Sequence, residues 1–138
     1  MTKEEKLKDL YDKNGLEKED IFILELGGKK VPIITRTGIE KIAAKNNISI
    51  VYEIISHNHK EGYFIIKGIG KMNMDDGKNP IKTITIESFG ECSPENNKQK
   101  YPLAISEKRC MSRVVLKLAG LYELGVFGQD ESEDFKQK

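Results

Sequence analysis

The alternation of apolar and polar residues is clearest in the last third of the chain, at residues 101–120. Apolar side chains recur there at intervals of three and four residues, so that at about 100° per residue they share one arc of a helix. The residues on this arc are Ala104, Met111, Val114, Val115, Leu118 and Tyr122. Pro102 suits the first turn of such a helix, where a backbone N–H has no partner within the helix. The pattern predicts a long helix that packs with this arc against a core.

Three segments in the middle of the chain show the two-residue period of a strand. They cover residues 48–55, 63–72 and 81–89. In the third segment Ile84 and Ile86 share one face, while threonine and glutamate side chains occupy the other. This alternation is typical of antiparallel strands that bury one face.

The first third of the chain predicts a short helix followed by a β-hairpin. Thr2 and Glu5 have the spacing of a capping box, and Gly15 can end the helix that they open. Two β-prone runs follow at residues 21–26 and 30–34. A Gly-Gly pair joins the two runs and favours a tight hairpin, because glycine tolerates positive φ.

A second short helix is predicted after the hairpin, where Thr37 and Glu40 form another capping box and Asn46 marks the expected end. These elements together predict an α+β fold with an antiparallel sheet and a β-β-β-α core. A hairpin and a short helix precede that core, and the long C-terminal helix packs on the sheet. The expected parts of the chain are an N-terminal helical extension at 1–20, a single domain at 21–128 and an acidic tail at 129–138.

Charge is distributed unevenly along the 138 residues, although the net charge is only +1. Residues 1–20 and residues 130–138 each carry a net charge of −2, which leaves +5 for the residues between them. A mildly basic centre between acidic ends permits nucleic-acid binding. The acidic tail can compete with an anionic ligand or fold back over its site.

Cysteine use and hydropathy predict an intracellular protein with no membrane partner. Cys92 and Cys110 are isolated and lack CxxC spacing, which suits a reducing compartment rather than a disulfide scaffold. No apolar run has transmembrane length, and the first ten residues are too polar for a signal peptide.

Basic residues recur every fourth position on the predicted long helix, at Arg109, Arg113 and Lys117, roughly opposite the apolar arc. Like charges at this spacing repel one another along one ridge, and an anion would relieve the repulsion. The alternative interpretation is an ordinary solvated helix face. Glu107 falls on the apolar arc, so we expect it to find a partner or to lie at the solvent-exposed end of the helix.

Sequence motifs of common enzymes are missing. Gly70 and the Gly77-Lys78 pair are too far apart for a phosphate-binding loop, and no serine or cysteine has the surroundings of a nucleophile. A zinc site would need histidines and cysteines from distant elements. Gly68 and Gly70 lie inside a predicted strand, where close packing is a better explanation than dinucleotide binding. We therefore expect a binding module with no catalytic residue, no metal and no cofactor.

Three segments carry a further pattern. The first is the helix opening ITRTGIEKIAAKNNIS, the second is the strand end and loop SFGECSPENNKQKYP, and the third is AISEKRCMSRVVLKLAGL followed by acidic QDESEDF. Together they resemble the single-strand annealing recombinases of phages and their relatives, the superfamily of Red-beta, Erf and the Rad fifty-two type. The resemblance covers residues 32–135, with Ile34-Thr35 kept in the first segment and a tyrosine of the family missing there.

The resemblance implies a protein that assembles into rings or helical filaments and binds single-stranded DNA in a basic groove between the sheet and the helix. It implies annealing of complementary strands in phage-type recombination, without ATP or metal, in the cytoplasm of a phage or bacterial host cell. An exonuclease or a single-strand-binding protein is an expected partner. The cations that match the family are Lys108, Arg109, Arg113 and Lys117. The strand pattern adds Lys67, Lys71 and Lys82 as binding candidates.

The physical requirements of annealing agree with these residues, because a row of cations holds a strand by its phosphates and leaves the base edges free to pair. Tyr63, Phe64 and Phe89 are candidates for base stacking, although packing in a core is the more common use of each. Replacement of Arg109 and Arg113 by alanine is predicted to weaken DNA binding and leave the fold intact, since both lie off the apolar arc.

Two other functions fit the same sequence. A double-stranded RNA-binding module has the same order of helix, three strands and helix, and its last helix presents cations to phosphates. A non-enzymatic accessory interaction protein would use the acidic ends as its contact surface. A strong preference for duplex RNA would favour the first alternative, and failure to bind any nucleic acid at low salt would favour the second.

Overall fold

A computed structural model describes residues 2–74, 77–95 and 100–136 of the chain, with side chains up to residue 132 in the last segment. The helices are α1 (Lys3–Lys13), α2 (Arg36–Lys45), α3 (Pro102–Leu118) and α4 (Gln129–Lys136), and two short 3-10 helices cover Lys18–Asp20 and Tyr122–Leu124. The strands are β1 (Ile21–Leu26), β2 (Lys29–Ile34), β3 (Ser49–Asn58), β4 (Tyr63–Met74), β5 (Lys82–Cys92) and β6 (Phe127–Gly128).

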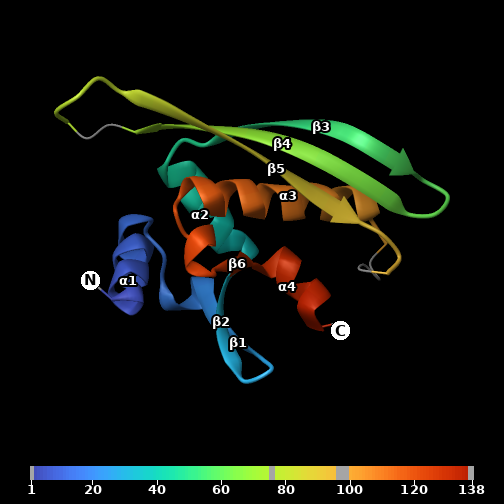
Figure 1. Cartoon of the computed structure of the whole chain (residues 1–138), viewed down its shortest axis with the longest axis horizontal. Coiled ribbons are helices and arrows are strands. Elements are labelled where there is room, and N and C mark those ends of the chain that lie inside the picture. The colour runs from blue at the N-terminus through green and yellow to red at the C-terminus, as the bar shows by residue number, and fades with distance from the viewer. Residues whose placement is uncertain (1, 75–76, 96–99, 137–138) are drawn as a thin grey trace.

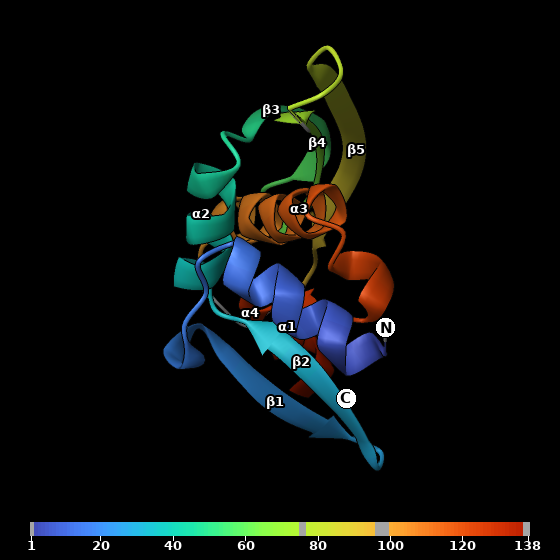
Figure 2. The same cartoon turned by 90° about the vertical axis from the view of Figure 1, so that its left-hand side faces the viewer.

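The strands form two separate sheets on opposite sides of α3. Strands β3, β4 and β5 make an antiparallel sheet in that order, and β1, β2 and β6 make a second sheet in which β6 runs parallel to β2. Figure 1 shows α3 beneath the larger sheet, with α2 at one end of α3, and with α4 and the β1–β2 hairpin further below. The view at 90° in Figure 2 shows α2 beside α3 and the hairpin projecting away from both.

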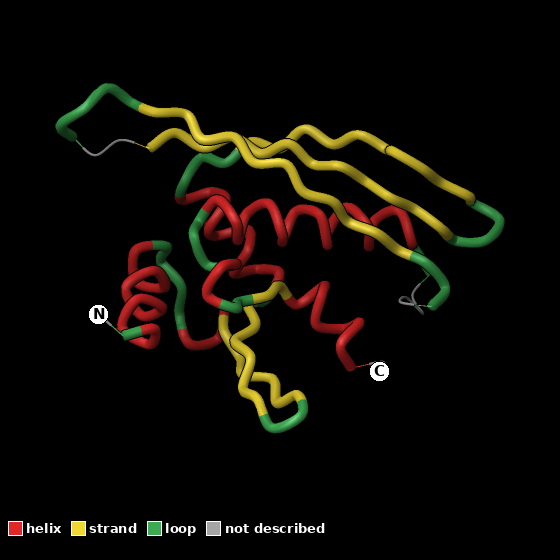
Figure 3. Tube along the Cα trace, in the orientation of Figure 1, coloured by secondary structure: helices red, strands yellow, loops and turns green. Residues whose placement is uncertain are grey.

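The predicted α+β fold is confirmed, including the three-stranded antiparallel sheet, the hairpin that precedes it and the long helix packed on the sheet. Figure 3 shows two elements that the sequence pattern did not predict, a short strand and a helix that follow α3. The strand is β6, which pairs with the end of β2, and the helix is α4, which occupies the predicted acidic tail. None of the helices in the described residues is long and apolar enough to cross a membrane.

Helix α2 begins two residues earlier than its predicted capping box. Thr35, not Thr37, is the N-cap, and its side-chain oxygen accepts a hydrogen bond from the Gly38 N–H at 3.1 Å. Both threonines have an acceptor hydroxyl, so local sequence did not distinguish them. The pairing of β2 with β1 decides the position, because it holds the chain in strand conformation up to Ile34.

Replacement of Thr35 by alanine is expected to lower the free energy of unfolding by about 1 kcal/mol, since it removes the cap of α2. The matched control is Thr37→Ala, which lies within the helix and is exposed. Urea denaturation followed by circular dichroism measures both changes. Equal effects of the two substitutions would contradict this assignment of the cap.

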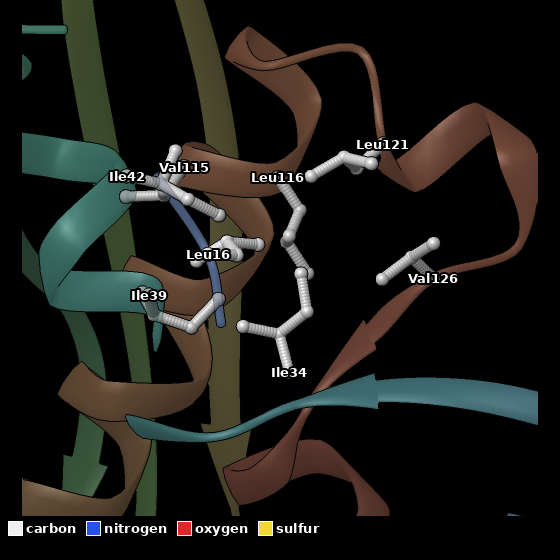
Figure 4. Packing of buried hydrophobic residues seen from close by; sticks show 8 residues of the cluster. All are labelled: Leu16, Ile34, Ile39, Ile42, Val115, Leu116, Leu121 and Val126. Atoms are coloured by element: carbon white, nitrogen blue, oxygen red, sulfur yellow. The ribbon is translucent and has the colours of Figure 1, made fainter. Parts of the chain in front are cut away.

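Two hydrophobic clusters lie on different sides of α3. The first contains Leu16, Ile34, Ile39, Ile42, Val115, Leu116, Leu121 and Val126. In Figure 4 the side chains of α2 in this cluster point toward those of α3, and Ile34 reaches it from the end of β2. The second cluster lies between α3 and the larger sheet and contains Ile66, Met72, Cys110, Val114 and Leu118. Helix α3 is therefore enclosed on two sides, and burying apolar surface on both is the main stabilisation of the fold.

Glycines allow α3 to approach the larger sheet closely. A Cβ atom on Gly68 would lie 2.5 Å from the Cys110 Sγ, and one on Gly70 would collide with the Val114 side chain. On β5, a Cβ atom on Gly90 would collide with the Ser106 carbonyl oxygen of α3. The close-packing interpretation of Gly68 and Gly70 is thus confirmed.

Helix α1 packs on the first cluster through Leu7, Leu10 and Tyr11. Its end is joined to the end of α2 by the Asn46 side-chain amide, which donates a hydrogen bond at 2.7 Å to the side-chain oxygen of buried Asn14. The predicted N-terminal extension therefore contributes to the packing of the first core cluster.

Candidate functional site

The basic ridge of α3 does not face solvent as expected. Arg109 is only 3% exposed, and the Arg113 side chain is 19% exposed. The reason is that the side of α3 left free by the two hydrophobic clusters is covered by the end of β5 and by α4. Helical periodicity correctly separated the cations from the apolar arc, but it could not show that other elements pack against the cations.

Arg109 holds three elements together through backbone carbonyls. Its Nε–H donates to the Asp130 carbonyl oxygen of α4 at 3.3 Å, and its guanidinium also donates to the Glu91 carbonyl oxygen of β5 at 3.0 Å. Removing this side chain would leave these carbonyl groups without their partner. The burial of Arg109 contradicts the premise that the joint replacement of Arg109 and Arg113 touches only an unpacked face, so we now expect that replacement to destabilise the fold.

Arg113 binds two carboxylates. It forms a bidentate pair with Glu91 at 2.8 and 2.9 Å, and its Nε–H donates to a Glu131 carboxylate oxygen at 3.0 Å. It also donates to the Phe89 carbonyl oxygen at 2.6 Å. The hydrogen bonds from Arg113 lower the pKa of Glu91, whereas burial raises the pKa of Glu131 in spite of the same arginine.

A third arginine, Arg36, completes this group. It lies in the first turn of α2, and its guanidinium pairs with the Asp130 carboxylate of α4. Its backbone N–H donates to the Gln129 side chain at 3.1 Å. Sequence reasoning did not include Arg36 because its partner is 94 residues away; its place in the segment ITRTG was the available signal.

We call Arg36, Arg109 and Arg113 the arginine cluster. They come from two helices and converge on two consecutive residues of α4, Asp130 and Glu131. These two acids are 2% and 6% exposed, respectively. Arginine donors in such an arrangement bind carboxylate or phosphate oxygens in a fixed geometry. The cluster is therefore an anion-binding arrangement, and in this structure the carboxylates of Asp130 and Glu131 occupy Arg36 and Arg113.

The remaining predicted cations of α3 lie at the margins of the cluster. Lys117 donates to the side-chain oxygen of buried Ser88 at 3.1 Å, and its ammonium lies 5.2 Å from the centroid of the Tyr122 ring. Lys108 is half-buried. Glu107 is exposed, which agrees with the second of the two expectations for it, a solvent-exposed position.

The predicted strand cations do not join the cations of α3. Lys67 and Lys71 alternate with the glycines of β4 that pack on α3, so they lie on the opposite face of the sheet. Lys67 there pairs with Glu87 at 3.5 Å. The space between sheet and α3 is filled by the second hydrophobic cluster. The expected basic groove between sheet and helix is therefore not formed by these residues.

Lys82 is separate again. It lies at the start of β5 opposite Met74 and is exposed. There it lines a cavity of about 510 Å³ together with Lys13 and several asparagines. The seven predicted binding residues are thus distributed over three regions, and only those of α3 lie near one another.

The three aromatic candidates divide in the same way. Tyr63 and Phe89 lie on the open face of the larger sheet and are 39% and 46% exposed, respectively. Phe64 is buried and lies beside His57 and His59, whose ring centroids are 6.2 and 5.0 Å from the centroid of the Phe64 ring. Two of the three are therefore accessible for stacking. Within the described residues, no three histidine, cysteine or acidic side chains are close enough to hold a metal ion.

Comparison with family models, with curated proteins and with solved structures finds no match for this chain.

Proposed function

We propose that this protein binds single-stranded DNA without ATP and promotes annealing of complementary strands in phage-type recombination. The observation that supports the proposal best is that Arg36 and Arg113 bind the carboxylates of Asp130 and Glu131, while Arg109 beside them binds the Asp130 backbone carbonyl. Phosphate oxygens accept the same charge-assisted hydrogen bonds from guanidinium groups. The sequence resemblance independently points to α3 as the DNA-binding element.

The cluster suits a strand held by its backbone. Its donors are guanidinium groups, which attract any phosphate regardless of the base attached to it. Arg36 also lies in the first turn of α2, and helix N-termini favour negative charge. Base edges would remain free, which annealing requires. Affinity should therefore fall steeply with salt and depend little on sequence.

The larger sheet offers a route to the homo-oligomer that the resemblance implies. Its two edge strands are β3 and β5, of 10 and 11 residues. Unpaired N–H and C=O groups on long edges can pair with another chain. Pairing β5 of one copy with β3 of the next would be a head-to-tail contact, which generates rings or helical filaments.

Fluorescence anisotropy with a labelled oligothymidine, titrated at low and high salt, tests binding. Annealing is tested by adding the complementary strand to a labelled mixed-sequence strand and measuring the rate of duplex formation. We expect salt-sensitive binding and accelerated duplex formation.

Arg36→Gln is expected to reduce the slope of log affinity against log salt by about 0.7, because one fewer phosphate is neutralised. Lys45→Gln is the matched control, since it removes the same charge from the other end of α2 and should leave the slope unchanged.

Three outcomes would contradict the proposal. A strong preference for duplex RNA would indicate a double-stranded RNA-binding module. No binding of any oligonucleotide at low salt would indicate an accessory interaction protein. An unchanged salt slope for Arg36→Gln beside normal binding would exclude Arg36 from the DNA contact.

A further inference from the structure

We propose that α4 is a built-in competitor for the arginine cluster, whose Asp130 and Glu131 must leave before the phosphates of a DNA strand can bind. This inference rests on the proposed function and adds regulation to the same site. It predicts a closed form, which the structure describes, and an open form in which α4 has detached.

The closed form denies a ligand access to the donors that bind α4. Arg109 is 3% exposed, and Asp130 and Glu131 are 2% and 6% exposed, although the Arg36 side chain is 44% exposed. A phosphate group cannot reach the donors that now bind Asp130 and Glu131 while those residues remain in place. Binding of a strand to the cluster therefore requires displacement of the first turn of α4.

The first turn of α4 is attached by polar contacts. The described side chains of this helix are Gln129, Asp130, Glu131 and Ser132, and none of these four belongs to either hydrophobic cluster. These residues contact α2 and α3 through hydrogen bonds and ion pairs with the arginine cluster. Such contacts weaken when anions compete for the same donors, whereas a hydrophobic contact would not.

The chain just before α4 provides a fixed point for such a movement. Strand β6 pairs with the end of β2, and a Cβ atom on Gly128 would lie 2.6 Å from the Ser112 side chain. Gly128 is thus packed closely against α3 and stays with the domain. Detachment would therefore begin at Gln129, the first residue of α4.

The exchange of one anion for another is close to balanced for Arg36 and Arg113, since each loses a carboxylate of α4 and gains a phosphate. The tethered acids nevertheless act at a high effective concentration, which for short tethers is of the order of millimolar. The observed affinity for DNA is the intrinsic affinity reduced by the fraction of molecules that are open. Weakening the contacts of α4 should consequently tighten DNA binding.

The test compares wild-type protein with the double variant Asp130→Asn and Glu131→Gln by anisotropy with the same labelled oligothymidine. Both substitutions keep the shape of the side chain and remove its charge. We expect the variant to bind about fivefold more tightly or better, because a larger fraction is open. The control is Asp9→Asn with Asp12→Asn, which removes two charges from exposed positions on α1 and should change affinity less than twofold.

Equal affinity of the variant and the control would overturn the competitor role and leave the proposed DNA binding intact. Hydrogen exchange on the wild-type protein provides a second measurement that does not depend on a stable variant. Saturating oligothymidine should remove protection from the amides of α4 and leave β6 protected. Unchanged or increased protection of α4 would also overturn the inference.

Absence of oligonucleotide binding by every form of the protein would defeat the proposed function itself. The attachment of α4 is then measured with inorganic polyphosphate, compared with chloride at the same ionic strength. Loss of α4 protection in polyphosphate but not in chloride would still support the displacement of α4 by anions. Equal protection of α4 in both salts would also reject the displacement of α4 by anions.

Discussion

Replacement of Arg113 by alanine is expected to lower the free energy of unfolding by about 3 kcal/mol. The substitution leaves the carboxylate of Glu131 in a site that is 6% exposed without its cation, and removing one partner of a buried pair costs about 3 to 5 kcal/mol. The low end applies because the second partner, Glu91, is half exposed and can be hydrated. Urea denaturation monitored by circular dichroism measures the loss.

The control for Arg113 removes both members of the pair. The double variant Arg113→Met with Glu131→Leu has no buried charge at this position, so it should be markedly more stable than Arg113→Ala. A loss below about 1 kcal/mol for Arg113→Ala would show that Glu131 is hydrated in solution, contrary to its burial in this structure.

Replacement of Gly90 by alanine is expected to cost about 3 kcal/mol or more. The new Cβ atom would collide with the Ser106 carbonyl oxygen and lie 2.6 Å from the Cys110 backbone nitrogen, so relief requires a shift of α3 itself. Overpacking of a close-packed interior typically costs about 1 to 3 kcal/mol, and an obstacle of backbone atoms places this position at the top of that range. Thermal and urea denaturation measure the effect.

Gly68→Ala is the matched control for Gly90. It adds the same methyl group on the same side of the sheet, but its nearest obstacle is the Cys110 Sγ, which belongs to a side chain. A smaller loss of stability is expected there. An equal loss in the free energy of unfolding for both variants would contradict the conclusion that Gly90 is required by the close approach of the α3 backbone to β5.

Much of the fold could be predicted because its signals are local. The two-residue period of Ile84 and Ile86 identified a half-buried strand, and the capping box of Thr2 and Glu5 identified the start of α1; both are present in the structure. Such patterns depend on neighbours within one turn or one strand, and the chain carries that information without reference to its tertiary structure.

The candidate site could be predicted only in part because its contacts are long-range. The ridge of Arg109 and Arg113 was found by helical spacing, but that spacing says nothing about which element covers the ridge. The ion pair of Arg36 with Asp130 joins residues that are 94 positions apart in the sequence. Charge counting identified the tail as acidic and able to fold back, yet a net charge does not reveal which cation each acid meets. Strand β6 was not predicted either, since a strand of two residues is too short to show an alternation of apolar and polar side chains.

The packing of α3 against the larger sheet has a consequence for how the molecule can move. Glycines on β4 and β5 let side chains and backbone of α3 pack directly against the backbone of these strands. Sliding or rolling of α3 would drive Val114 and the backbone near Ser106 into neighbouring strands. The sheet and α3 should therefore behave as one stiff body, with hydrogen exchange slowest along their shared surface. Any opening of this protein must come from the parts attached around that body.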